Sequence, residues 1–458
     1  MKKIIIFLIG TVGALAILPL IGNEYVKSHI EEKVATLDSY GLGVEKHTND
    51  SSYLSSKQHY EFLLEDGDKF LEYLSQYSDK QIPKYVNAAL EGVLIGMDVE
   101  YSNIPFTKAV SIDIYPLALS PKMAENIKQD DITFYTYLEK FLESKGILYH
   151  INYNILSKDF DGYIKDVKET YTLKDKTELL LELKKAIYKG NGDLIAPNSL
   201  ISNIDYIHMK VKNDQAEILF TLNDLSSSYT FDSQFTYLSG GKVKNLDITI
   251  DTDDEDIALK AKDIQVNVSS NDQGEKAELN AKASMESLDF KSNKLIFKTK
   301  SFAYDIAANE IDKKTFEKLQ TLMAKSNTQS SDALSKEIAD TSIDLLSKGL
   351  KLKIAQWNLE DIILNETQAL GGFDVKMDLE IKEDPALASK LQVSPMLVAQ
   401  NIDMVLNVKI SKLIYANLTV NQPMAGTMAP YMKEDGDSLL FDITFKQGEL
   451  KLNGKALR

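Results

Sequence analysis

Apolar and polar residues alternate along most of the chain after residue 192. This alternation is typical of β-strands with one buried and one solvated face, because successive side chains of a strand point to opposite faces. Long runs of this kind favour a meandering, curved antiparallel sheet over parallel strands joined by helices. The apolar positions of the clearest strands are Ala216, Ile218, Phe220 and Leu222; Leu246, Ile248 and Ile250; Ala277, Leu279, Ala281, Ala283 and Met285; Phe373, Val375, Met377, Leu379 and Ile381; Ile402, Met404, Leu406, Val408 and Ile410; and Leu439, Phe441, Ile443 and Phe445.

The apolar positions change parity within one predicted strand. They are odd-numbered over 257–261 and even-numbered over 264–268. We interpret the change as a β-bulge or a break at 262–263. Before residue 192 the pattern is mixed, with one clearly alternating strand over 147–155.

Helical periodicity appears on both sides of that strand. Apolar residues recur every three or four positions over 70–77 and 134–142, and Asp68 and Asp130 stand where N-cap residues are expected. A third helix is predicted over 177–186.

A pair of helices is predicted near 312–349. A polar loop at 326–331 separates the two helices. Gly349 is expected to end the second one, since glycine readily adopts the left-handed conformation that follows helix C-termini. We expect this pair to cover one open end or one face of the sheet.

The N-terminus carries an uncharged apolar run at residues 4–22, preceded by Lys2 and Lys3. A helix over this run would rise about 28 Å, close to the roughly 30 Å of a bilayer's hydrocarbon core. Lysines before the run predict that the N-terminus stays in the cytoplasm and that the rest is exported. We interpret the run as an uncleaved signal anchor. The alternative is a cleaved signal peptide, which has the same charged start.

An amphipathic stripe follows the anchor over 26–37 and predicts a helix that continues outward until Gly41 and Gly43. This stripe is expected to pack on the chain's own domain. The alternative is that it packs on a partner or on a second copy of the chain.

Composition and charge remove several classes of protein. The chain has 52 Lys+Arg against 68 Asp+Glu, a formal net charge of −16, and no Cys. An acidic chain lacks the basic face that displaces counterions from nucleic acid, so no nucleic-acid partner is expected. The absence of Cys excludes disulfides, thiolate metal sites, iron–sulfur clusters and cysteine nucleophiles.

No residue emerges as catalytic, cofactor-binding or metal-binding. The sequence has no GxSxG elbow, HExxH, P-loop or Rossmann fingerprint. The acidic run 251–256 resembles the start of a calcium loop, but Asp256 stands where that loop needs Gly and Lys262 where it needs Glu. We interpret the run as a solvated hairpin tip. The five histidines lack the spacing of a zinc site and are interpreted as solvated or packed residues: His29, His47, His59, His150 and His208.

Three segments carry a resemblance to a known family. They are 222–250 (LNDLSSSYTFDSQFTYLSGGKVKNLDITI), 350–357 (LKLKIAQW) after the helical pair, and 448–454 (GELKLNG) in the terminal hairpin. Together they resemble the YdgA-like family of bacterial envelope proteins. The resemblance extends over nearly the whole chain and includes the lysine-led anchor. It implies anchoring in the inner membrane, a large exported domain and self-association, but the family has no defined function and contributes no catalytic residues.

These observations predict an α+β fold, with an N-terminal transmembrane helix followed by a mainly antiparallel, curved β-sheet domain with helical interludes. The expected organisation is an anchor at 1–22, a mixed α+β region at 23–190 and a β-rich region at 191–458. The expected location is the bacterial inner membrane, with the bulk of the chain in the periplasm. We expect a binding or scaffold protein of the envelope that handles lipid or a protein partner, either as a monomer or as a homodimer. The alternative is an envelope hydrolase that uses carboxylate acid/base chemistry.

Overall fold

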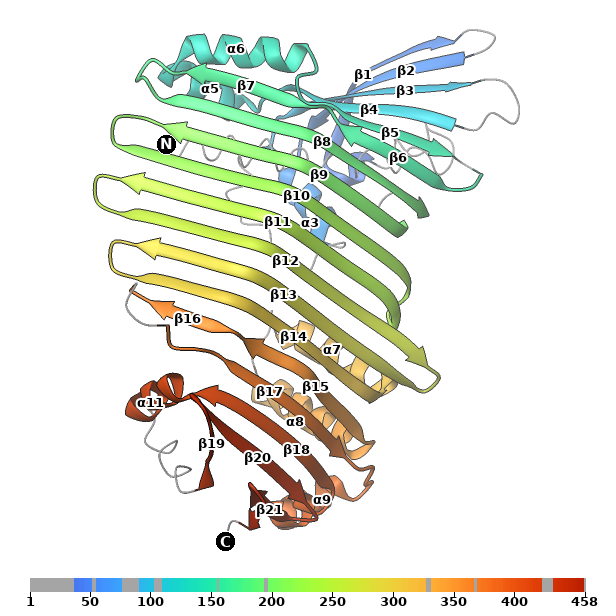
Figure 1. The fold of residues 1–458 in the computed structure, drawn as a ribbon. Helices are drawn as coiled ribbons and strands as arrows, with labels where there is room; N and C mark the ends of the chain where they lie inside the picture. The colour runs from blue at the N-terminus through green and yellow to red at the C-terminus, as the bar shows by residue number, and fades with distance from the viewer. Residues whose placement is uncertain are drawn as a thin grey trace. The chain divides into compact units, whose positions relative to one another are not determined.

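The computed structural model describes residues 37–51, 55–75, 90–102, 109–154, 156–192, 197–326, 331–365, 369–421 and 431–456 (Figure 1). The predicted membrane anchor at 4–22 and the stripe that follows it, apart from Leu37, lie outside these residues. Within the described ranges, no helix has the length and apolar character needed to cross a membrane. The chain divides into an N-terminal unit (1–229 and 249–254) and a C-terminal unit (230–248 and 255–458).

The described strands of the N-terminal unit pair antiparallel in chain order from β1 to β6. Strand β6 then pairs with β8, which also pairs with β7 and β9, and β9 pairs with β10. The strands are β1 (Leu42–Ser51), β2 (Ser55–Leu64), β3 (Leu94–Ser102), β4 (Ala109–Ala118), β5 (Tyr149–Asn154), β6 (Asp159–Ile164), β7 (Val167–Thr172), β8 (Glu178–Gly192), β9 (Pro197–Lys212) and β10 (Ala216–Ser233); the helices are η1 (Asp38–Tyr40), α3 (Gly67–Ser75), α5 (Pro121–Asp130) and α6 (Ile132–Glu143).

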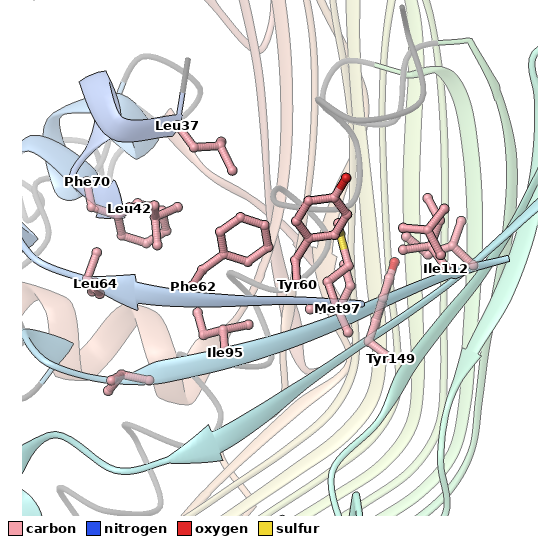
Figure 2. Packing of buried hydrophobic residues seen from close by; sticks show 14 of the residues in the cluster. Leu37, Leu42, Tyr60, Phe62, Leu64, Phe70, Ile95, Met97, Ile112 and Tyr149 are labelled. Carbon is pink, nitrogen blue, oxygen red and sulfur yellow. The ribbon is translucent and has the colours of Figure 1, made fainter. Parts of the chain in front are cut away.

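The core of this unit lies on one face of strands β2 to β5 (Figure 2). Phe62 and Met97 are completely buried, at 0% exposure. Leu37, which precedes β1 in the chain, and Phe70 of α3 pack against the apolar face and close it. Alternation in these strands therefore produces a sealed core on one side and a polar surface on the other.

Two helices predicted from periodicity are present as α3 and α6, but their caps differ from the prediction. The N–H of Lys69 donates to Asp66 Oδ1 at 3.0 Å, so Asp66 takes the capping role predicted for Asp68. Asp131 is the N-cap of α6, whereas Asp130 ends α5. Both cap predictions were wrong because only a residue with extended backbone can turn its side chain onto the first helical N–H groups.

The prediction of a helix over 177–186 is wrong, because residues 178–186 belong to strand β8. Leu183 pairs with Ile207 of β9, and Ala186 pairs with Ile204. Lys185 lies between them with φ 49°. This left-handed residue changes the parity of the strand and leaves apolar residues three positions apart, a spacing that imitates a helix.

The described strands of the C-terminal unit also pair antiparallel. The pairing order is β12, β13, β14, β15, β17, β18, β20, β21, β22; strand β16 pairs with β14, and β19 pairs with β20. The strands are β11 (Thr236–Thr252, with residues in both units), β12 (Asp256–Gln273), β13 (Lys276–Ser292), β14 (Ile296–Asp312), β15 (Leu350–Leu359), β16 (Asp361–Leu364), β17 (Phe373–Ile381), β18 (Ile402–Ser411), β19 (Lys433–Asp435), β20 (Ser438–Lys446), β21 (Glu449–Leu452) and β22 (Lys455–Ala456); the helices are α7 (Lys313–Ser326), α8 (Asp332–Ser347), α9 (Leu387–Val393), α10 (Pro395–Ala399) and α11 (Lys412–Asn421).

The mainly antiparallel, β-rich fold with helical interludes is thus confirmed. Helices α7 and α8 are the pair expected near 312–349, and they connect β14 to β15. The parity change predicted at 262–263 coincides with Asp263, whose φ is 48°. Lys262 pairs with Ser287 of β13 and Gln265 pairs with Ser284, so the two strands have the same number of residues between these pairs. The feature is therefore a break in the pattern without the extra residue of a β-bulge.

Candidate functional site

A row of polar residues crosses the N-terminal sheet on the face opposite its core. Each residue of this His–Asp row is the direct cross-strand partner of the next, so all of them project from the same face. The row consists of Thr48, His59, Asp98, Asp113, His150 and Tyr163, on strands β1 to β6.

Asp98 is the centre of the hydrogen bonding in this row. Its Oδ1 lies 2.7 Å from Nδ1 of His59. Its Oδ2 accepts a hydrogen bond from the Tyr115 hydroxyl at 2.9 Å and another from the Lys145 ammonium. The same carboxylate therefore joins side chains of β2 and β4 to Lys145, two residues beyond the end of α6.

Both ring nitrogens of His59 face carboxylates, because Nε2 lies 3.2 Å from Oε1 of Glu61. A charged imidazolium satisfies both acceptors with its two N–H groups. His150 is placed similarly at the other side of the row, with Nδ1 2.7 Å from Oδ1 of Asp113. The side chain of His150 is only 18% exposed, so the prediction of a solvated histidine is corrected to a half-buried one with a carboxylate partner.

The surroundings of Asp98 and of the neighbouring Glu61 favour the ionised form of both carboxyl groups. Burial disfavours the charged form of Asp98, but hydrogen bonds from Lys145, His59 and Tyr115 outweigh it and lower the pKa of the carboxyl group. The hydrogen bond from Lys46 lowers the pKa of Glu61, against the opposing effect of burial. A groove of about 400 Å³ runs along the row and along neighbours such as Asp50 and Glu100.

This chemistry does not match that of a carboxylate acid/base pair. Such a pair needs one carboxyl group whose pKa is raised, so that it can donate a proton near neutral pH. Several described carboxyl groups have a lowered pKa instead, among them Asp98, Asp131, Asp312 and Asp384. Nor does any group of three or more His, Asp or Glu in these ranges have an arrangement that could hold a metal ion.

The remaining sequence candidates occupy separate places. The ring of His47 stacks on Tyr60 at 4.3 Å between centroids, and Nδ1 of His208 lies 2.8 Å from the Thr221 hydroxyl. The run 251–256 forms the exposed turn between β11 and β12, as predicted. His29 lies outside the described residues.

A second surface, the apolar face, crosses seven strands of the C-terminal sheet. Cross-strand partners align apolar side chains in rows from β12 or β13 to β20. The first row is Val268, Ala281, Ile306, Ile354, Met377, Leu406 and Ile443; the second is Val266, Ala283, Tyr304, Trp357, Val375, Val408 and Phe441; and the third is Leu279, Ala308, Leu352, Leu379, Met404 and Phe445.

The apolar face is only partly covered. Most side chains of the three rows are half-buried, and Trp357 and Val266 are 42% and 41% exposed. A small sealed cluster forms around Leu439, Phe441 and Leu452 at one edge of the sheet. The rows therefore keep a partial exposure to solvent, which is greatest at Trp357 and Val266.

The opposite face of the same sheet is charged. Lys351 and Glu380 form an ion pair at 3.6 Å, and Lys382 and Asp403 form another at 2.8 Å. These strands also line a groove of about 590 Å³ whose other charged residues include Asp378. Because charged and apolar side chains alternate along each strand, the sheet is amphipathic throughout.

Comparison with known proteins identifies a family and no characterised relative. No curated protein and no solved structure matches the chain. A family model described as a bacterial protein of unknown function, DUF945, matches residues 197–458, which include the whole apolar face. Since the matched residues make up more than half of the chain, the protein belongs to the DUF945 family of bacterial proteins of unknown function.

Proposed function

We propose that this protein is a membrane-anchored binding protein of the bacterial cell envelope, and that its apolar face holds the acyl chains of lipids. The anchor is the apolar run at 4–22, with the N-terminus in the cytoplasm and the remainder in the periplasm. The resemblance to YdgA-like envelope proteins supports this arrangement. An inner-membrane anchor keeps the domain beside a supply of lipid.

The observation that carries the proposal is the partial exposure of the apolar face. Exposed apolar area costs about 25 cal/mol per Å² relative to burial, so a partly exposed apolar surface favours an apolar ligand. The rows centred on Met377 and Val375 consist of aliphatic and aromatic side chains. An acyl chain requires no hydrogen bonds and matches such a surface, whereas a protein partner would also need polar groups around it.

An envelope hydrolase receives less support from the same molecule. His59 of the His–Asp row contacts Asp98, a carboxylate whose ionised form is stabilised. A carboxylate mechanism needs the opposite shift in one member of the pair. The row is better suited to holding strands β2 to β5 in register.

Photo-crosslinking tests the proposal directly, because alternate residues of one strand face opposite sides. Benzoylphenylalanine would replace Met377 or Leu406 on the apolar face, and Lys376 or Asn407 on the charged face as matched controls. After irradiation of intact cells, mass spectrometry of the purified protein should find phospholipid attached at the first two positions only. Equal attachment at all four positions, or attachment at none, would contradict acyl-chain binding on this face.

A further inference from the structure

Helices α9 and α10 form an exposed apolar tip between strands β17 and β18. The tip, residues 391–399, has the sequence LQVSPMLVA and contains no charged residue. Val393 and Met396 at its end are 77% and 79% exposed, while Leu391 and Leu397 beside them are 41% and 40% exposed. Leu387 and Val398 are buried and hold the two helices together. The apolar side chains therefore project from a built structure.

Three backbone N–H groups at the turn of the tip have hydrogen-bond partners in the same segment. The N–H of Ser394 donates to the carbonyl of Lys390 at 2.9 Å, and the N–H of Leu397 donates to the carbonyl of Ser394 at 3.0 Å. The N–H of Met396 donates to the Ser394 hydroxyl at 3.3 Å, and Pro395 has no N–H. A segment can enter hydrocarbon only if its backbone polar groups have internal partners, and this tip meets that condition at its turn.

A polar base lies directly behind the tip. The Lys390 ammonium lies 2.6 Å from Oδ2 of Asp384, and the same carboxylate accepts a hydrogen bond from the Asn401 amide. The ion pair between Lys382 and Asp403, at 2.8 Å, lies at the adjoining strand ends. Charged groups thus begin where the uncharged run ends. A bilayer has the same arrangement, with an apolar hydrocarbon core bordered by polar headgroups.

From these observations we infer that the α9–α10 tip inserts into a phospholipid bilayer and gives the protein a membrane contact apart from its N-terminus. The tip is convex, since its end residues are more than three-quarters exposed. A protein partner would need a pocket shaped to receive them, whereas acyl chains adapt to any apolar protrusion. The contact is independent of acyl-chain binding on the apolar face, because the tip residues belong to none of its rows.

The absence of Cys from the natural chain allows a position-specific test. The full chain with Met396→Cys would carry the environment-sensitive fluorophore NBD and be reconstituted into vesicles of phosphatidylethanolamine and phosphatidylglycerol. Its emission should rise and shift to the blue, and nitroxide-labelled lipids should quench it. Adding Val393→Asp to the labelled variant should reduce both effects. The matched control is Lys336→Cys on the exposed face of α8, whose label should stay in water.

Three outcomes would overturn the inference. Emission at position 396 characteristic of water in the vesicles would show that the tip does not insert. A blue shift that appears without lipid and grows with protein concentration would show that a second copy covers the tip. Equal quenching at 336 and 396 would show that the domain meets the bilayer without preference for the tip. Because the label reports position 396 alone, these outcomes are separate from any result of crosslinking on the apolar face.

Discussion

The N-terminal and C-terminal sheets have the same alternating strands, yet only the first seals its apolar face. Phe62 on β2 is 0% exposed, whereas Trp357 on β15 is 42% exposed. Both residues lie on the apolar side of antiparallel strands whose other side is charged. Alternation therefore specifies that a face is apolar, and the segments that lie over it decide whether the face becomes a core.

Element lengths account for part of the difference. Strands β1 to β4 have 9 or 10 residues each, and Leu37, Phe70 of α3 and Leu90 pack against their apolar face. Strand β12 has 18 residues and spans about 59 Å, while α7 has 14 residues and spans about 21 Å. A helix of that length cannot cover β12 along its whole length. Strands β15, β17, β18 and β20 have 9 or 10 residues, as in the N-terminal sheet, so at these strands the exposure of the apolar face does not follow from strand length.

The largest predicted effect breaks the sealed core. Phe62→Ala removes an aromatic ring from the centre of the N-terminal core and should lower the free energy of unfolding by about 3–5 kcal/mol. Hydrogen exchange read out by mass spectrometry should become faster in peptides of β2, β3 and β4. Unchanged exchange in those peptides would show that this core tolerates a cavity and that the contrast between the two sheets is smaller than proposed.

The next effect concerns a helix that covers its sheet. Asp131 accepts the N–H groups of Thr133 and Phe134 at 2.9 and 3.1 Å, and its other oxygen accepts the N–H of Lys174 at 2.9 Å. Asp131→Ala should cost about 2 kcal/mol, because a helix cap is lost and buried N–H groups lose their acceptor. Urea unfolding monitored by circular dichroism would measure the loss. Asp130→Ala is the matched control and should cost less. An equal loss of stability in the two variants would show that Asp131 is not the residue that caps α6.

Much of the fold follows from the sequence, and the exceptions have local causes. The strands after residue 192 and the helices α6, α7 and α8 were predictable because their apolar positions keep a single period. The segment 177–186 was wrongly predicted to be a helix, because the left-handed conformation of Lys185 shifts the apolar residues of β8 from one parity to the other. Similar residues occur within β10, β12 and β14, at Asp224, Asp263 and Ser301. Only the one at Asp263 left a parity change that we recognised in the sequence.

The candidate sites were much less predictable. His59, Asp98, Asp113 and His150 lie on four different strands, and only the strand register makes them neighbours. The sequence signal that could have found them is His or Asp on the polar parity of consecutive predicted strands. The alternation of apolar and polar residues predicted the apolar face. Its exposure depends on how much of that face α7 and α8 cover, and the periodicity of the sequence carries no information about this.

A smaller effect is expected on the open apolar face. Met377→Ala removes a side chain that is only partly buried, so it should cost about 1 kcal/mol, less than a change in the sealed core. Trp357 is the only Trp of the chain, and its cross-strand partner Val375 is two residues from Met377, so its emission reports urea unfolding of this sheet. A cost as large as that of Phe62→Ala would show that Met377 belongs to a sealed core.

The smallest effect is a difference in acid sensitivity between the two sheets. The pKa of Asp98 in the folded protein is lower than its ordinary value of 3.8, so ionised Asp98 stabilises the folded N-terminal sheet above that pH. As the pH falls through the lowered pKa, the carboxyl group gains a proton and the contribution is lost. Glu61, lowered from 4.5, acts in the same direction from a slightly higher pH.

Asp98→Asn removes the titrating group while retaining an oxygen that accepts hydrogen bonds from Tyr115 and Lys145. Urea midpoints from circular dichroism, measured between about pH 5 and pH 3, should therefore fall less steeply in the variant than in the natural protein. The side chain of Asp98 is about one-third exposed, at 34%, so solvent screening keeps the difference small. The urea midpoint reported by Trp357 emission should keep the same pH dependence in both proteins, because Trp357 lies on the C-terminal sheet. Identical pH slopes by circular dichroism would mean that Asp98 and the His–Asp row contribute nothing to the acid stability of the N-terminal sheet.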